Sequence, residues 1–301
     1  MVTQPISNEA SIDLDALIRE RDDLRIERDS LAAASDNVQQ PWVAYEPALV
    51  PHHNLMLDEG VHVLEEWYRW AEEWQMLLRI YGGLTRKSKV MEIGCGTGRT
   101  AFPLRFILSP DGSYDGFDIS PKKVSFLEES FHRAYPNFRF VLSDVHNHSY
   151  NPEGAIKAES FLFPYQNAAF DIVYAASVFT HMLPDAAKNY FQQAARVLKP
   201  EGRCVFSFFI FDNYQPDQER PLGFANPAFN FDYSFADYGD KFAIAEPDVP
   251  DQMTAYSVEF IEEIAEQAGL KFAQAPLPGF WSGSHECWVG TQDIVILEKV
   301  K

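Results

Sequence analysis

The stretch VMEIGCGTGRT, residues 90–100, is an apolar run that ends in an acidic residue and then in glycines at every second position. The apolar run predicts a buried strand, and the glycines predict a tight turn from that strand into a helix. Because Gly94, Gly96 and Gly98 have no side chains, a ligand can approach the main chain there and meet the positive end of the helix. This pattern alone does not identify the ligand, since many doubly wound proteins bind nucleotides at such a turn.

From residue 88 onward, apolar segments of strand length alternate with segments of helical pattern. We expect strands in KVMEIGC, SYDGFDIS, FRFVLSDV, FDIVYAAS, KPEGRCVFSFFIF, KFAQAPL and QDIVILEKV. Continuous apolar strands separated by helices predict a parallel sheet that is buried on both faces. The predicted fold class is therefore α/β, a doubly wound Rossmann-like sheet whose ligand crevice lies at the carboxyl ends of the strands.

The N-terminal region, residues 1–40, is rich in charged residues. Within it Leu17, Leu24 and Leu31 repeat every seven residues, which predicts a solvated helix over 11–35 with a thin leucine seam. This helix either pairs with a second copy in a short coiled coil, giving a homo-oligomer, or lies along the body of the protein.

The remaining chain is expected to form a linker and one large domain. Residues 41–84 begin as a proline-containing extended linker and continue as a helix with an aromatic stripe that caps the main domain. Residues 85–301 form the ligand-binding domain. Inside it, residues 211–253 are irregular and rich in aromatic and acidic residues, which predicts a lid over the site.

Composition restricts the class of protein. The formal net charge of −19 over 301 residues disfavours nucleic acid and membranes as partners, because both are anionic. Cys95, Cys204 and Cys287 are far apart, which predicts free thiols in a reducing compartment. No apolar run reaches membrane-spanning length and no signal-peptide pattern is present, so we expect a cytoplasmic protein.

Polar residues follow the predicted strands in order. Asp118 ends the second strand, where a carboxylate can accept hydrogen bonds from both ribose hydroxyls. Asp144 ends the third strand, and SVFTHMLP follows the fourth. Each acid alone is more simply a helix cap or a loop charge, but a set at the ends of successive strands favours a nucleoside site.

With these motifs the chain resembles the class I S-adenosylmethionine-dependent methyltransferases, strongly over residues 85–210. The resemblance is carried by VMEIGCGTG, GFDIS, LSDV, FPYQNAAFDIVYAASVFTHM and ARVLKPEGR. It implies a seven-stranded sheet with an antiparallel last strand and S-adenosylmethionine as the cofactor. The implied cofactor-binding residues are Glu92, Gly94, Cys95, Gly96 and Gly98 near the methionine and sugar, Asp118 and Ile119 at the ribose and adenine, Asp144 and Val145 at the adenine edge, and Ala176 and Ser177 near the amino acid portion.

A nicotinamide-dependent dehydrogenase is the nearest rival. Its fingerprint spaces the glycines as G-x-G-x-x-G, whereas this chain has G-x-G-x-G. The segment ARVLKPEGR before the fifth strand is also not expected in that class.

His181 is the candidate catalytic base, because it follows the fourth strand and imidazole titrates near neutrality. The alternative is that His181 only caps a helix or bonds the backbone. His52 and His53, in the N-terminal region, are candidate substrate contacts, as are Trp281 and His285 in the loop between the last two strands. With Trp288 and the lid, these aromatic residues could form a wall for a sugar or a flat ring, or could only pack the lid.

The spacing of Asp144, His146 and His148 permits a divalent metal, but no ordered acidic cluster supports one, and we predict no metal site. We expect methylation of a hydroxyl on a small molecule or glycan. The alternatives left open are N-methylation of a small amine, and a regulatory subunit that binds the cofactor without turnover.

Overall fold

The structure is a computed structural model of the chain, and it describes residues 47–213, 231, 233–234, 239–282 and 288–300. The elements below belong to the unit Ala48–Lys301, apart from the first residue of η1. The charged helix expected over residues 11–35, and with it the coiled coil, lies outside the described residues.

A seven-stranded sheet forms the centre of the domain, in the order β3-β2-β1-β4-β5-β10-β9. Strand β1 pairs in parallel with β2 and β4, whereas β10 pairs antiparallel with both β5 and β9. This confirms the predicted doubly wound fold with a reversed last strand. The strand bounds are Lys89–Ile93 (β1), Ser113–Asp118 (β2), Phe138–Leu142 (β3), Phe170–Ala175 (β4), Leu198–Phe208 (β5), Leu270–Phe272 (β9) and Asp293–Lys299 (β10).

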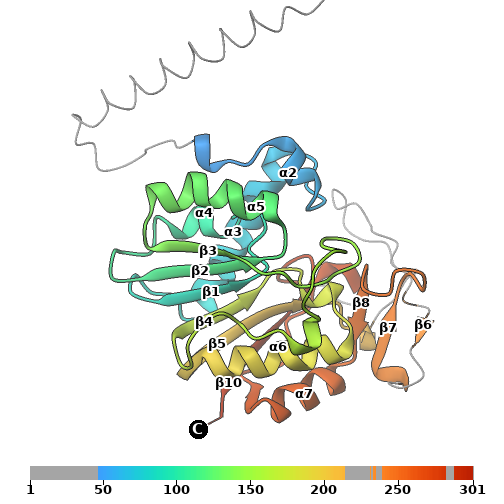
Figure 1. The fold of residues 1–301 in the computed structure, drawn as a ribbon. Helices are drawn as coiled ribbons and strands as arrows, with labels where there is room; N and C mark the ends of the chain where they lie inside the picture. The colour runs from blue at the N-terminus through green and yellow to red at the C-terminus, as the bar shows by residue number, and fades with distance from the viewer. Residues whose placement is uncertain (1–46, 214–230, 232, 235–238, 283–287, 301) are drawn as a thin grey trace, which may run out of the picture. The chain divides into compact units, whose positions relative to one another are not determined.

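Helices cover both faces of this sheet (Figure 1). On one face lie α3 (Leu64–Ile80), α4 (Ala101–Leu104) and α5 (Pro121–Leu127), and on the other lie α6 (Pro184–Val197) and α7 (Val258–Gln267). Each face is therefore a separate apolar core, as the continuous apolar strands predicted. Among the described residues, no helix is both long enough and apolar enough to cross a membrane.

Short helices fill several connections. The extended linker expected before α3 contains α2 (His53–Leu57), so that expectation is wrong for this stretch. Met56 of α2 packs with Val61 and Trp67 in a small apolar cluster, which explains why the segment folds. The other short elements are η1 (Pro47–Leu49), η2 (Glu128–His132, a π-helix that continues α5), η3 (Ala158–Ser160), η4 (Phe179–His181), η5 (Phe211–Asn213), η6 (Gly239–Lys241) and η7 (Phe280–Ser282).

The insertion predicted to be an irregular lid contains a second, antiparallel sheet in its described part. Its strands are β6 (Tyr233–Ser234), β7 (Phe242–Ile244) and β8 (Thr254–Tyr256). Tyr256 connects this sheet to the main domain, because its N–H donates to the carbonyl of Phe209 (2.9 Å) and its hydroxyl donates to the carbonyl of Met182 (2.5 Å). The role of this segment as a lid stays a prediction.

A buried carboxyl group links three neighbouring strands, β2, β1 and β4. Glu92 in β1 is 3% exposed, and it accepts hydrogen bonds from the hydroxyls of Tyr114 in β2 and Tyr174 in β4. Gly116 opposes Glu92 in β2, and a Cβ there would lie 2.9 Å from the Tyr114 hydroxyl oxygen. Burial raises the pKa of Glu92 from 4.5 to about 7, although both tyrosine hydrogen bonds act in the opposite direction.

This pKa predicts a pH-dependent stability. Between pH 4.5 and about 7 the folded protein holds a proton on Glu92 that the unfolded chain has lost, so this contribution to stability disappears as the pH rises through 7. Glu92→Gln is neutral throughout. We therefore expect the unfolding free energy of the variant minus that of the wild type to increase from pH 5 to pH 8, by up to about 3 kcal/mol. Urea unfolding at both pH values measures it, and a pH-independent difference would contradict it.

Candidate active site

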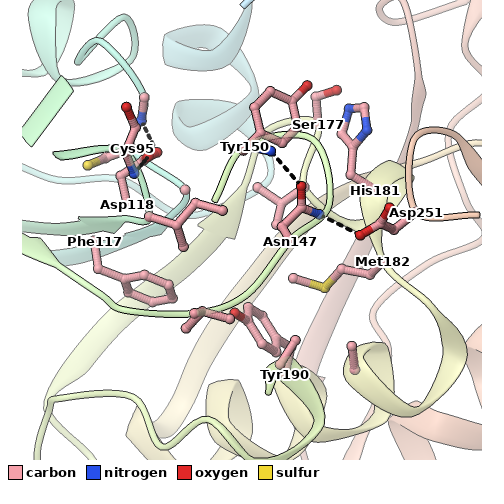
Figure 2. Close-up of a pocket in the computed structure, with 18 of the residues that line it drawn as sticks. Cys95, Phe117, Asp118, Asn147, Tyr150, Ser177, His181, Met182, Tyr190 and Asp251 are labelled. Carbon is pink, nitrogen blue, oxygen red and sulfur yellow. Dashed lines mark hydrogen bonds between the residues drawn. The ribbon is translucent and has the colours of Figure 1, made fainter. Parts of the chain in front are cut away.

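A cavity of about 620 Å³ opens at the carboxyl ends of β1, β2 and β4, which is the ligand position expected for a doubly wound sheet. Figure 2 shows Cys95 and Asp118 on one side of the cavity and Ser177, His181 and Asp251 on the other. The predicted site residues that line it are Glu92, Gly94, Cys95, Gly96, Asp118, Ile119, Val145, Ala176, Ser177 and His181. The structure thus brings together most of the cofactor-binding residues implied by the sequence.

The glycines after β1 are required by the backbone. Gly94, Gly96 and Gly98 have φ values of +69°, +52° and +76°, a left-handed conformation that residues with a Cβ rarely adopt. Each also faces a side chain of the protein: Val178 at Gly94, Leu127 at Gly98 and Glu59 at Gly96. Gly98 packs on α5 and is not on the cavity wall. The expectation that ligand approach explains all three glycines is therefore too simple.

Glu59 follows α2 and reaches across to the turn. Its carboxylate accepts the N–H of Thr97 (2.6 Å) and the Thr97 hydroxyl (3.0 Å), and it lies 3.6 Å from the ammonium of Lys123. Both charged side chains are nearly buried, at 12% and 8% exposure. Trp67 donates its indole N–H to the same hydroxyl (3.0 Å). The sequence gives no local sign of this contact, because the partners are separated by 38 residues.

Asp118 holds two turns at once. One carboxylate oxygen accepts the N–H of Gly96 (2.8 Å) and the other accepts the N–H of Ser120 (2.8 Å), which begins α5. The side chain is 8% exposed and lines the cavity. Each oxygen retains capacity for a further donor, so the carboxylate can also accept ribose hydroxyls.

Arg99 lines the same side of the cavity and was missed in the sequence. Its guanidinium lies 4.9 Å from the centre of the Trp70 ring, and its Nε is buried without a hydrogen-bond partner among the described residues. A half-buried guanidinium with a free Nε is suited to a carboxylate of the kind that S-adenosylmethionine carries in its amino acid portion. With Asp118 for a ribose, the residues present fit this cofactor.

The ends of the third and fourth strands contribute differently. Val145 is buried on the cavity wall, whereas Asp144 is exposed and lies off the wall.

Ser177 has a φ of +58°, which is unfavourable for a serine. It is held by the hydroxyl of Ser207, which accepts its N–H (2.8 Å), and by the side chain of Gln292, which donates to its hydroxyl (2.8 Å). Such enforced strain is common at functional sites.

His181 lies on the opposite side of the cavity from Asp118. Its Nδ1 is 2.6 Å from the carbonyl oxygen of Gln252. A carbonyl only accepts, so Nδ1 carries the proton and Nε2 keeps a lone pair when the ring is neutral. Burial lowers the pKa of His181 below 6.5, which favours the neutral ring. The ring also lies nearly perpendicular to that of Tyr150, at 85° and with the ring centroids 5.5 Å apart.

Three predicted substrate contacts do not lie on the cavity wall. His52 and His53 are exposed at the start of α2, and Trp281 is buried, donating its indole N–H to Asp293 (2.5 Å) and packing on Phe209. Trp281 therefore has the packing position that the sequence left as the alternative. His285 lies outside the described residues.

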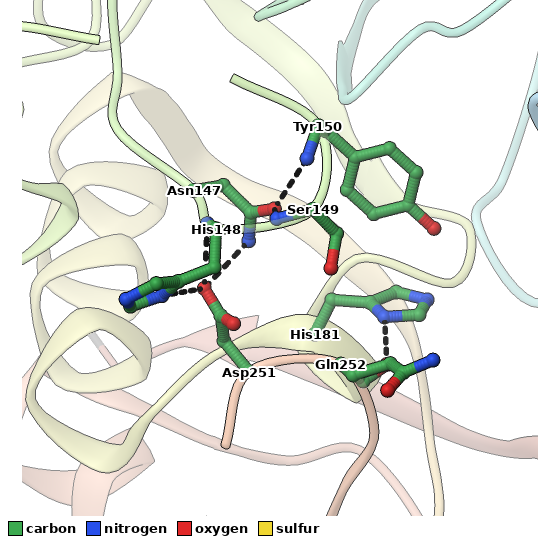
Figure 3. Close-up of polar contacts among 7 residues, drawn as sticks. All are labelled: Asn147, His148, Ser149, Tyr150, His181, Asp251 and Gln252. Carbon is green, nitrogen blue, oxygen red and sulfur yellow. Dashed lines mark hydrogen bonds and ion pairs between the residues drawn. The ribbon is translucent and has the colours of Figure 1, made fainter. Parts of the chain in front are cut away.

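The metal arrangement considered for the third strand does not form. Within the described ranges, no group of three or more His, Cys, Asp or Glu side chains is placed to hold a metal ion. His148 instead contacts the carboxylate of Asp251 through Nδ1 (3.1 Å), as Figure 3 shows.

Comparison with known proteins identifies the domain. A family model described as a methyltransferase domain matches residues 91–204, which include the glycine turn, Asp118 and His181. This match agrees with the resemblance of residues 85–210 to the class I S-adenosylmethionine-dependent methyltransferases.

Two curated relatives and one solved structure illustrate the similarity. Over 159 residues the chain is 29% identical to 27-O-demethylrifamycin SV methyltransferase of Amycolatopsis mediterranei, covering 53% of this chain and 51% of that one. Over 182 residues it is 27% identical to methyltransferase calH of Penicillium decumbens, covering 55% and 45%. The chain thus spans about half the length of these relatives. The PH0226 protein of Pyrococcus horikoshii shares the fold, with a TM-score of 0.50, 17% identity and coverage of 78% and 91%.

Replacing Asp118 tests the cofactor side of the site. Asp118→Ala removes the acceptor of two backbone N–H groups and of the ribose hydroxyls, so we expect affinity for S-adenosylhomocysteine to fall at least about tenfold in calorimetric titration. Asp115→Ala is the matched control, because Asp115 is also buried in β2 but pairs with Arg139 away from the cavity. Unchanged affinity in Asp118→Ala, or an equal loss in the control, would refute this role.

Replacing Glu59 tests the contact with the turn. Glu59→Gln leaves the nearly buried Lys123 without its counter-charge, so we expect the free energy of unfolding to fall by about 1–3 kcal/mol in chemical denaturation. Glu66→Gln in the same region is the control, because the contact that Glu66 makes is with an exposed N–H, that of His62 (3.1 Å). A fall no larger than that of the control would mean that the contact contributes little.

Proposed function

We propose that this protein transfers a methyl group from S-adenosylmethionine to a hydroxyl oxygen of a small molecule or glycan, with His181 as the general base. The observation that carries the proposal is the orientation of His181. Its Nδ1–H is committed to the Gln252 carbonyl, and the ring lines the cavity that also contains the glycine turn and Asp118.

Each side of the cavity has a separate task in this scheme. Asp118, the glycine turn and Arg99 would hold the cofactor, which when bound supplies a methyl group whose bond to sulfur breaks, the electron pair remaining on sulfur. The acceptor oxygen forms the new bond to that methyl carbon. Nε2 of His181 takes the hydroxyl proton, so the products are a methyl ether and a protonated imidazole that releases its proton to water.

An oriented neutral imidazole favours oxygen over nitrogen as the acceptor. A hydroxyl is weakly acidic and a poor nucleophile, so removal of its proton assists the attack. A neutral amine already has a nucleophilic lone pair and needs no base before the attack. The name of one relative, 27-O-demethylrifamycin SV methyltransferase, also specifies an oxygen. N-methylation of a small amine is therefore the less favoured alternative.

A regulatory subunit that only binds the cofactor is also less favoured. Such a role needs the residues on the Asp118 side of the cavity. A regulatory role does not explain why the tautomer of His181 is fixed on the opposite side of the cavity. The carbonyl that fixes it belongs to Gln252, 71 positions further along the chain.

Replacing His181 tests the proposed base. His181→Ala should lower turnover at saturating acceptor by about 10²–10⁴-fold, with affinity for S-adenosylhomocysteine unchanged. Because burial lowers the pKa of His181, wild-type activity should fall on the acidic side only below pH 6.5. His132→Ala is the matched control, since His132 bonds the carbonyl of Phe138 in the same way (2.7 Å) but lies outside the cavity. Turnover that survives in His181→Ala would exclude His181 as the base.

A further inference from the structure

Asp251 is a buried carboxylate that the sequence did not reveal as part of the site. It lies in the loop between β7 and β8, is 8% exposed and lines the cavity. One oxygen, Oδ2, accepts three hydrogen bonds: from the side chain of Asn147 (3.0 Å), from the N–H of His148 (3.1 Å) and from its Nδ1 (3.1 Å). These contacts fix the carboxylate against the loop after β3 (Figure 3).

The other oxygen, Oδ1, is buried and has no hydrogen-bond partner among the residues that the structure describes. Leaving a buried acceptor unsatisfied is costly, and native proteins do so rarely outside functional sites. The partner oxygen is already satisfied, so the carboxylate cannot rotate to relieve Oδ1 without breaking three other contacts. A ligand in the cavity that donates a hydrogen bond would remove this cost.

The same loop also orients the proposed base. Gln252, the next residue, provides the carbonyl that holds Nδ1 of His181, so one dipeptide places both groups at the cavity. Asp251 and His181 both line the cavity, and Asp251 directly precedes the residue whose carbonyl oxygen lies 2.6 Å from Nδ1 of His181. A molecule whose hydroxyl lies at His181 is therefore within reach of Asp251.

We propose that Oδ1 of Asp251 accepts a hydrogen bond from a second hydroxyl of the acceptor, next to the hydroxyl that is methylated, so that the acceptors are polyols with neighbouring hydroxyl groups. This inference rests on the proposed function. A hydroxyl suits the site better than an ammonium, because the three donors on Oδ2 already offset much of the carboxylate charge.

Asp251→Asn tests the subsite with little change in size. The amide oxygen can keep the three donors, while the amide nitrogen takes the place of Oδ1 and cannot accept a hydrogen bond. The matched control is Asp248→Asn, the same substitution at an exposed position of the same loop. Thermal unfolding and affinity for S-adenosylhomocysteine should be the same in both variants and the wild type.

The acceptor probes are methyl hexopyranosides and their monodeoxy counterparts, with turnover followed as S-adenosylhomocysteine formed. The wild type and Asp248→Asn should prefer the intact diol over the monodeoxy compound by about tenfold or more in kcat/KM. Asp251→Asn should lose at least that factor on the diol, mainly through KM, and little on the monodeoxy compound, so that the preference disappears.

The outcomes separate this inference from the proposed function. Transfer to hydroxyls with no diol preference, or with a preference that Asp251→Asn retains, would overturn the subsite and leave the proposed function intact. If turnover depends on Asp251 only when the acceptor is a small amine, the polyol class is wrong. The same follows if the cofactor binds but no methyl group is transferred to any of the glycosides. Failure to bind S-adenosylmethionine or S-adenosylhomocysteine would remove the proposed function itself.

Discussion

The position of the whole site depends on one carboxylate, that of Asp118. Its two oxygens accept one backbone N–H from the turn after β1 and one from the turn after β2, so the carboxyl ends of two neighbouring strands are fixed relative to each other. The turn after β1 contains three glycines in the left-handed conformation. The N–H of Gly98 donates to the carbonyl of Cys95 within the turn (2.9 Å), whereas the N–H of Gly96 finds its acceptor in Asp118. With that turn fixed, Thr97 presents its N–H and hydroxyl to Glu59, and the segment before α3 is held against the domain.

Much of the sheet could be predicted because its signals are local. Apolar runs, helical periodicity and glycines at strand ends are properties of neighbouring residues, and strand order then follows from the handedness of the crossovers. The same reasoning expects Asp118 and His181 at one edge of the sheet, where both line the cavity, and their roles there stay predictions. It could not find Asp251, whose contact with His148 joins residues 103 positions apart, or Glu59, which lies in a stretch taken for a linker.

Gly96 shows that a glycine at a strand end is not by itself evidence for a bound ligand. The glycine does mark a close approach to the main chain, and its φ of +52° requires it. The group that approaches is a side chain of the same protein, the carboxylate of Glu59. A glycine pattern thus predicts the backbone conformation and the space next to it. The occupant of that space depends on tertiary contacts, which need the structure.

The loop that contains Asp251 and Gln252 meets two requirements of the site, the orientation of His181 and the proposed contact with the acceptor, through separate groups. Orientation of His181 uses a main-chain carbonyl, which any residue at position 252 would provide. The contact proposed for the acceptor uses the side chain at position 251, which a substitution changes directly. Proton removal therefore depends on the main chain of residue 252, whereas the choice of acceptor depends on the side chain of residue 251. A change at 251 can alter which molecule is bound while the base keeps its tautomer, provided that Asn147 and His148 still find an acceptor for their donors.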